Sequence, residues 1–173
     1  FSALVCAGAL AFPDAVKLVQ QRGAFMQTAV PVGEGAMAAI IGLDDELVNQ
    51  ACADAVASTG EVVAAVNYNS PGQVVIAGKA NAVAVAGENC KAAGAKRALP
   101  LPVSAPFHTE LMKPAGEQLE EVLAQLTVSA PDIPVVHNVH AETETDPVRI
   151  RALLVEQIYS PVQWTACVQK MAG

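Results

Sequence analysis

The sequence is short of aromatic residues, of long apolar runs and of basic charge. Phe, Tyr and Trp make up 4% of the 173 residues, which excludes a large aromatic surface for stacking on ligands. No uninterrupted apolar run reaches the ~18 residues that a membrane-spanning helix needs. Ten Lys and Arg against 17 Asp and Glu give a net charge of −7. Because polyanions bind clustered positive charge, we expect neither a nucleic acid nor a membrane as partner, and any phosphate contact to be local.

The four cysteines lack the spacing of a metal site or of a disulfide framework. Cys6, Cys52, Cys90 and Cys167 fall in segments with the pattern of apolar helix faces. We therefore expect small buried side chains in a reducing compartment, the cytoplasm. The chain begins at Phe1 with neither a methionine nor a basic leader, and it stops directly after an amphipathic stretch. These ends predict an internal part of a longer protein.

Strands and helices alternate in the middle of the chain. The residues between 34 and 104 predict the order βαββαβ, which is the split βαβ arrangement of a ferredoxin-like unit with two helices on one face of an antiparallel sheet. The flanks, residues 1–33 and 105–173, predict α/β pieces of a larger domain around this insert. The expected strands are 36–43, 61–67, 73–77, 96–103 and 135–139, and the expected helices are 15–29, 44–58, 80–93, 108–126, 146–159 and one from 161.

Arg22 lies near the middle of the apolar face of the first predicted helix. A guanidinium in that position is costly unless its donors are paired, since its charge cannot be removed at physiological pH. The partner is either a buried protein carboxylate or a ligand carboxylate or phosphate.

His108 follows prolines at 100, 102 and 106, which hold the chain extended until a helix begins. A side chain that titrates near neutral pH at such a junction is a candidate proton carrier. The alternative is a histidine that packs at a domain junction.

Three other patterns carry weaker signals. The segment 67–73 has the composition of an Asx-rich turn, and Ser104 has no G-x-S-x-G elbow around it, so a turn hydroxyl is favoured over a nucleophile. His137 and His140 should point to opposite faces of a strand, so we expect no metal site. Lys91, Lys96 and Arg97 form the one basic cluster, which is either a solvated face or a contact for an acidic partner.

Ordered landmarks along the whole chain resemble the malonyl-coenzyme A:acyl carrier protein transacylases of bacterial fatty acid synthesis. They are QRG at 21–23, FMQ at 25–27, GAMAA at 35–39, NYNSPGQVVIAG at 67–78, AKR at 95–97, LPLPVS at 99–104, FH at 107–108, LM at 111–112, NV at 138–139 and YSPVQW at 159–164.

The resemblance implies a role for several residues. It makes His108 the catalytic base and Arg22 the ligand of the malonyl carboxylate, and it places Met26, Phe107 and Asn69 at the substrate. Phe107 before the histidine is similar to the pattern of malonyl-selective acyltransferase domains. The nucleophilic serine of the family's G-H-S-x-G elbow has no counterpart here, and Ser2 lies after it.

The family fold implied is an α/β-hydrolase-like large domain, incomplete in this chain, with an inserted ferredoxin-like subdomain. The implied substrates and partners are malonyl-coenzyme A and acyl carrier protein, with no further cofactor and no metal. Lys91, Lys96 and Arg97 become candidate contacts for the carrier protein or for coenzyme A. Two alternatives stay open: an acyltransferase domain of a polyketide synthase or of a malonate decarboxylase, and a catalytically inert fragment with only a binding or structural role.

Overall fold

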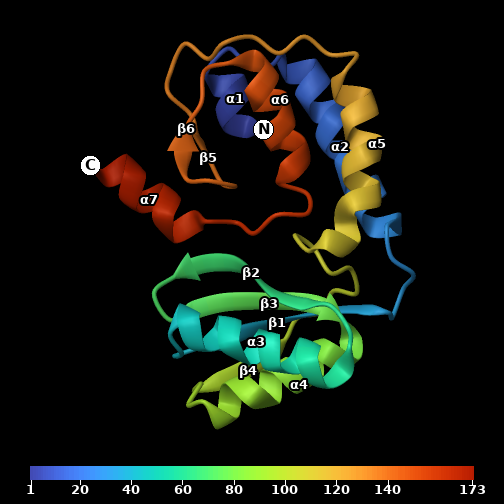
Figure 1. Cartoon of the computed structure of the whole chain (residues 1–173). Helices are drawn as coiled ribbons and strands as arrows, with labels where there is room; N and C mark the ends of the chain where they lie inside the picture. Colours follow the sequence, from blue (N-terminus) through green and yellow to red (C-terminus); the bar gives the residue numbers. More distant parts are fainter.

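Helices and strands gather in two groups, and together they form a mixed α/β structure. The computed structural model describes residues 1–173, and Figure 1 shows the helical group at one end and the main sheet at the other. In chain order the elements are α1 (Ser2–Cys6), α2 (Phe12–Thr28), β1 (Gly35–Ile41), α3 (Asp45–Thr59), β2 (Val63–Ser70), β3 (Gln73–Lys79), α4 (Ala80–Ala92), β4 (Arg97–Pro100), the 3-10 helix η1 (Glu110–Met112), α5 (Lys113–Leu123), β5 (Val136–His137), β6 (Glu142–Thr143), α6 (Pro147–Glu156) and α7 (Trp164–Ala172).

The main sheet has four antiparallel strands in the order β2-β3-β1-β4. Helices α3 and α4 cover one face and bury a core with it, which includes Val48, Ile40, Ile76 and Val83. Local signals set the limits of α3: Asp44 precedes it in an extended conformation, and Gly60 ends it with a left-handed φ of 70°. The predicted order βαββαβ is confirmed for residues 35–100.

The opposite face of the sheet carries a smaller apolar cluster. Met37, Val66, Val75 and Ala77 are buried there, and Leu101 and Phe107 pack against them. Phe107 also packs against the helical group, so this face points toward the helices. The residue before His108 is therefore held between the two groups.

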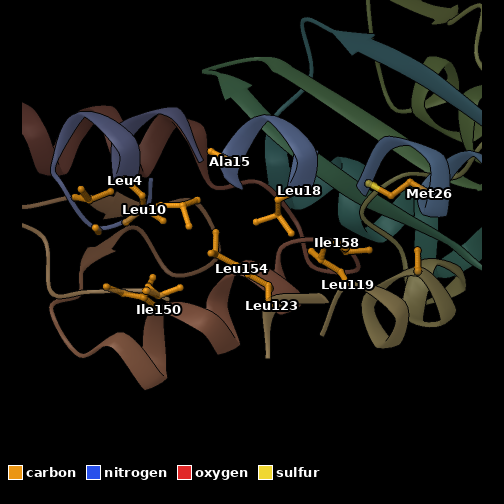
Figure 2. Packing of buried hydrophobic residues seen from close by; sticks show 14 of the residues in the cluster. Leu4, Leu10, Ala15, Leu18, Met26, Leu119, Leu123, Ile150, Leu154 and Ile158 are labelled. Atoms are coloured by element: carbon orange, nitrogen blue, oxygen red, sulfur yellow. The ribbon is translucent and has the colours of Figure 1, made fainter. Parts of the chain in front are cut away.

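The helical group has its own core. Side chains from α1, α2, α5, α6 and the residues just after α6 meet in it, and Figure 2 shows Leu18, Leu119, Leu154 and Ile158 among them. Helix α2 packs on α5, and α5 packs on α6. Burying a side chain of this size contributes about 1.5–3 kcal/mol, so this core fixes the direction of α2 and of the end of α6.

The segment after α6 runs along the edge strand β2. The amide of Tyr68 donates to the carbonyl of Val162 at 3.0 Å, and the amide of Val162 donates to Val66 at 2.8 Å. The Thr165 hydroxyl donates to the Tyr68 carbonyl at 3.0 Å. These bonds tie the C-terminal segment to the outer edge of β2.

Gly35 lets another segment cross the sheet closely. A Cβ on Gly35 would collide with the Pro106 ring and with the carbonyl oxygen of Ser104. The chain that leads to His108 therefore passes directly over the start of β1, where no side chain stands in its way.

Several expectations were wrong in detail. Residues 67–70 are strand and not turn, because β2 continues its hairpin pairing with β3 as far as Ser70 and Gln73. The last strand ends at Pro100, and Val103 and Ser104 lie outside it. Cys6 is exposed, whereas the other three cysteines are buried as expected. None of the helices combines the length and the hydrophobicity needed to cross a bilayer.

Candidate active site

A tight loop between β4 and η1 presents His108. The Phe107 amide donates to the Ala105 carbonyl at 2.9 Å, and the buried Thr109 hydroxyl donates to the Pro106 carbonyl at 2.7 Å. His108 has a φ of 63°, one of two non-glycine residues with a left-handed backbone. That conformation costs about 1–2 kcal/mol, and it persists here because the loop is closed on both sides of the histidine.

The imidazole of His108 is fixed through Nδ1. This atom lies 2.7 Å from the main-chain oxygen of Gln157 at the end of α6. A carbonyl oxygen can only accept, so Nδ1 carries the proton and donates. The neutral ring then has its lone pair on Nε2, which can take a proton from a neighbouring group.

Burial keeps His108 neutral near physiological pH. Desolvation is the largest influence and lowers the pKa of His108 from its ordinary value of 6.5. The hydrogen bond to Gln157 raises the pKa, the positive charge of Arg22 lowers it, and the main chain at Ser160 raises it again. The net lowering favours the form that accepts a proton, as a general base requires.

Arg22 projects from α2 toward the end of α6. Its Nη2 donates to Oε1 of Gln157 at 2.8 Å, while its buried Nε has no hydrogen-bond partner. The guanidinium carbon lies 5.9 Å from the centroid of the Phe1 ring. Burial lowers the pKa of Arg22, yet an arginine keeps its charge at neutral pH. The structure contains no carboxylate within 4 Å of this guanidinium.

Gln157 joins the two predicted residues. Its side-chain amide accepts from Arg22, and its main-chain carbonyl accepts from His108. Arg22 and His108 come from different parts of the chain, and the structure brings them to one buried glutamine. The combination offers a proton acceptor next to a cationic group that lacks an anionic partner.

An open groove of about 330 Å³ runs beside His108. Its walls include Glu110, Tyr159 and Pro161 on one side and Gly60 and Val63 on the other. It separates the end of α6 from the start of β2, so the imidazole is reachable from outside.

The three predicted substrate contacts lie at different depths. Phe107 is half-buried beside His108, between the sheet and the helical core. Met26 is buried in the helical core, one turn beyond Arg22 on α2 (Figure 2). Asn69 is half-buried near the end of β2. Phe107 and Met26 thus flank the two charged or titrating residues, and Asn69 belongs to the edge strand.

The basic cluster lies at the end of α4 and the start of β4, whereas His108 lies in the loop that follows β4. Lys91 is in the last turn of α4, and Lys96 and Arg97 lead into β4 at the outer edge of the sheet (Figure 1). Lys91 forms an ion pair with Glu88 at 2.8 Å. An open groove of about 560 Å³ between α4 and the sheet passes beside Lys91.

The expectation for His137 and His140 was wrong in its geometry. Strand β5 ends at His137, the chain turns, and the two ring centroids lie 6.1 Å apart. Burial lowers the pKa of His137. No group of three or more His, Cys, Asp or Glu side chains has the geometry to hold a metal ion.

Sequence reasoning did not single out Gln157. The signal was available, because Gln157 lies on the same helical face as Ile150 and Leu154 and is a polar residue among apolar ones. Its partners could not be deduced, since they come from α2 and from the loop before η1.

The acyl transferase domain family model matches residues 1–173. The malonyl CoA-acyl carrier protein transacylase of Escherichia coli (strain K12) is 60% identical over 173 residues, which cover all of this chain and 55% of that protein. The protein of the same name from Bacillus subtilis is 52% identical over 171 residues, 99% of this chain and 54% of that protein. The chain spans about half the length of the curated relatives it matches.

Solved structures agree with these matches. An acyl carrier protein S-malonyltransferase from Vibrio cholerae superposes with a TM-score of 0.95 at 60% identity, covering 98% of this chain and 55% of that one. A malonyl-transacylase solved in complex with a type II polyketide synthase acyl-carrier protein superposes with a TM-score of 0.94 at 52% identity, covering 98% of this chain and 54% of that one.

Proposed function

Because this chain belongs to the acyl transferase domain family, we propose that it supplies the base and the carboxylate-binding residue of a malonyl-coenzyme A:acyl carrier protein transacylase. The observation that carries the proposal is the link between Arg22 and His108 through Gln157. It joins a cation without an anionic partner to a neutral imidazole with Nε2 free to accept a proton. The cation suits a substrate with a free carboxylate, and the imidazole suits an acyl exchange that needs proton transfer.

The first half of the reaction loads the enzyme. The nucleophile is a serine hydroxyl from outside these 173 residues, as the family resemblance implies. His108 Nε2 takes the hydroxyl proton while the oxygen attacks the malonyl thioester carbonyl. When the tetrahedral intermediate collapses, the carbon–sulfur bond breaks, and the departing coenzyme A sulfur receives the proton from Nε2.

The second half reverses the roles. The phosphopantetheine thiol of acyl carrier protein gives its proton to Nε2 and attacks the seryl ester. The carbon–oxygen bond breaks, and the serine oxygen regains the proton. Throughout, Arg22 binds the free malonyl carboxylate through charge-assisted hydrogen bonds. Exchange between oxygen and sulfur esters changes no oxidation state, so no step needs a redox cofactor, and the proposal includes no metal.

We extend the proposal to the other assigned residues. Phe107 and Met26 shape the acyl pocket beside His108 and Arg22, and Asn69 contacts the bound substrate from β2. For the fold, residues 34–104 form a ferredoxin-like subdomain within an α/β-hydrolase-like large domain made of 1–33 and 105–173. The strand order β2-β3-β1-β4 with both helices on one face supports the first part. The cytoplasm is the proposed compartment.

Mass spectrometry tests the proposed function directly. The complete product of the reading frame that encodes this chain should gain one malonyl group when incubated with malonyl-coenzyme A, and lose it when acyl carrier protein is added. An unmodified protein after incubation would contradict the proposal and favour an inert binding role.

The basic cluster is proposed to contact acidic carrier protein or the coenzyme A phosphates. Reversing charge with Lys91→Glu, Lys96→Glu and Arg97→Glu together should raise KM for one of these two substrates at low salt, because rim charges mainly steer encounter. Steady-state kinetics with each substrate varied in turn measures the effect. If the KM for each substrate is the same in the variant as in the wild type, the cluster is a solvated face and contacts neither substrate.

A second candidate function differs in the carrier protein that accepts the malonyl group, while the reaction stays the same. The malonyl-transacylase at 52% identity was solved with a polyketide carrier protein, which makes a polyketide carrier a candidate acceptor here as well. Comparing kcat/KM for a fatty acid carrier and a polyketide carrier distinguishes the two.

A further inference from the structure

Gln157 is buried, with 6% of its surface exposed, and its side chain and main-chain oxygen bind three different segments. Its Nε2 donates to the Leu154 carbonyl at 2.8 Å, one turn back in α6. Its Oε1 accepts from Arg22 on α2, and its main-chain oxygen accepts from His108 in the loop before η1. Three separate segments therefore meet at one residue.

The amide of Gln157 has only one orientation that satisfies both neighbours. A guanidinium can only donate and a carbonyl can only accept, so Oε1 must face Arg22 and the NH₂ group must face Leu154. The bond from Nε2 to Leu154 thus locks the side chain, and the locked Oε1 holds Nη2 of Arg22. Arg22 is positioned before any ligand arrives.

The choice of an amide matters for charge. A carboxylate at this position would neutralise Arg22 and compete with an anionic ligand. The amide oxygen instead takes one donor and leaves the positive charge uncompensated. The Nε of Arg22 is buried and has no partner, so this donor of the charged group is left unsatisfied.

We infer that the side chain of Gln157 is a positioning residue that sets the preference for acyl groups with a free carboxylate, by holding Arg22 in place without cancelling its charge. The inference rests on the proposed function and deepens it. Because the contact to His108 comes from the main chain of the same residue, replacing the side chain separates the two tasks: carboxylate recognition is lost while the imidazole keeps its acceptor.

Gln157→Leu in the complete reading-frame product removes Oε1 and retains the main-chain carbonyl. We expect KM for malonyl-coenzyme A to rise about tenfold or more, as for a lost hydrogen bond to a charged group, with a much smaller change in kcat/KM for acetyl-coenzyme A. Gln157→Met, which matches the length of glutamine, should give the same shift in preference. Gln125→Leu is the matched control, because Gln125 is exposed after α5 and should keep the wild-type preference.

Circular dichroism measures the fraction of folded enzyme for each variant, so that a loss of folded protein is not mistaken for a change in substrate preference. If the Leu and Met variants lose malonyl and acetyl transfer in equal proportion, or keep the wild-type preference, the inference is overturned while the proposed function stands. If the wild-type product transfers neither group, the proposed function fails, and the inference fails with it. A selective loss of malonyl preference in both variants supports the inference.

Discussion

His108 combines a left-handed backbone with a ring that is anchored at one nitrogen. The anchor to Gln157 settles which nitrogen is free, and burial keeps the ring neutral. A surface histidine would meet neither condition, since water would compete for Nδ1 and solvate the protonated form. These two constraints are the physical content of its assignment as a base.

Replacing this histidine should affect chemistry far more than folding. We expect His108→Ala in the complete reading-frame product to slow acylation by malonyl-coenzyme A roughly a hundredfold or more, the usual contribution of a general base. Quenched-flow mass spectrometry of the acyl-enzyme measures the rate. His140→Ala is the control, since His140 lies in the β5–β6 turn and only accepts from the Glu142 amide. An unchanged rate for His108→Ala would rule out the assigned role.

At the residue scale the sequence was most informative where a residue does not fit the polarity or the backbone pattern of its segment. Arg22 stood out as a charge on an apolar face and His108 as a titrating group after three prolines, and both bind Gln157 in the structure. Gln157 gave the same kind of signal, but a neutral amide on a buried face is less costly than a charge and attracts less notice. The distances that connect these residues depend on tertiary packing, which no local pattern contains.

At the scale of elements, periodicity and capping predicted most helices and strands to within a few residues. The failures share one cause, which is strand pairing. Residues 67–70 pair with the start of β3 in a hairpin and so remain strand, and a short hairpin through His137 replaces a longer strand. How far each strand extends depends on the backbone that pairs alongside it, which the local composition does not specify.

The close crossing of the segment before His108 over β1 can be tested by substitution at Gly35. Gly35→Ala places a methyl group against Pro106 and the Ser104 carbonyl, so the loop that carries His108 must shift. We expect a loss of about 1–3 kcal/mol in the free energy of unfolding, together with reduced acylation. Urea unfolding of the complete reading-frame product gives the first quantity.

The control for this substitution is Gly23→Ala in α2. A Cβ on Gly23 meets nothing within 4 Å, so the same chemical change should stabilise the helix by about 0.5–1 kcal/mol. Equal effects at the two positions would contradict the close crossing at Gly35.

At the scale of the whole molecule, the two groups of elements are joined where the site lies. Phe107 packs on both cores, and the segment after Gln157 pairs with β2. Opening between the groups would therefore break the packing of Phe107, the residue before His108, and the pairing of the segment that follows Gln157. The alternation of elements predicted the sheet with its two helices, whereas the joint itself depends on long-range contacts that the sequence does not show.

The two histidines with lowered pKa values predict a pH dependence of stability. For both His108 and His137 the folded state binds a proton less readily than the unfolded state, whose pKa is near the ordinary 6.5. In the interval between the lowered pKa and 6.5 the unfolded chain holds more protons, so the free energy of unfolding rises with pH. Above that interval the histidine contribution is constant.

Urea unfolding of the complete reading-frame product at pH 5, 6, 7 and 8 measures this dependence. Stability should fall on acidification below about pH 6.5, and the slope should be smaller in His137→Gln, which removes one titrating group. If the protein instead becomes more stable from pH 7 to pH 5, the prediction is contradicted, because the histidines would then gain proton affinity on folding.

The central claim is that Arg22 and His108 form one unit that recognises a carboxylate and moves a proton. The most direct measurement is the ratio of kcat/KM for malonyl-coenzyme A to that for acetyl-coenzyme A, in the wild-type complete product and in Arg22→Ala. We predict that the ratio falls by about a hundredfold, because the charged hydrogen bonds to the carboxylate are lost while the acetyl group never made them. A ratio that stays at the wild-type value would contradict the account.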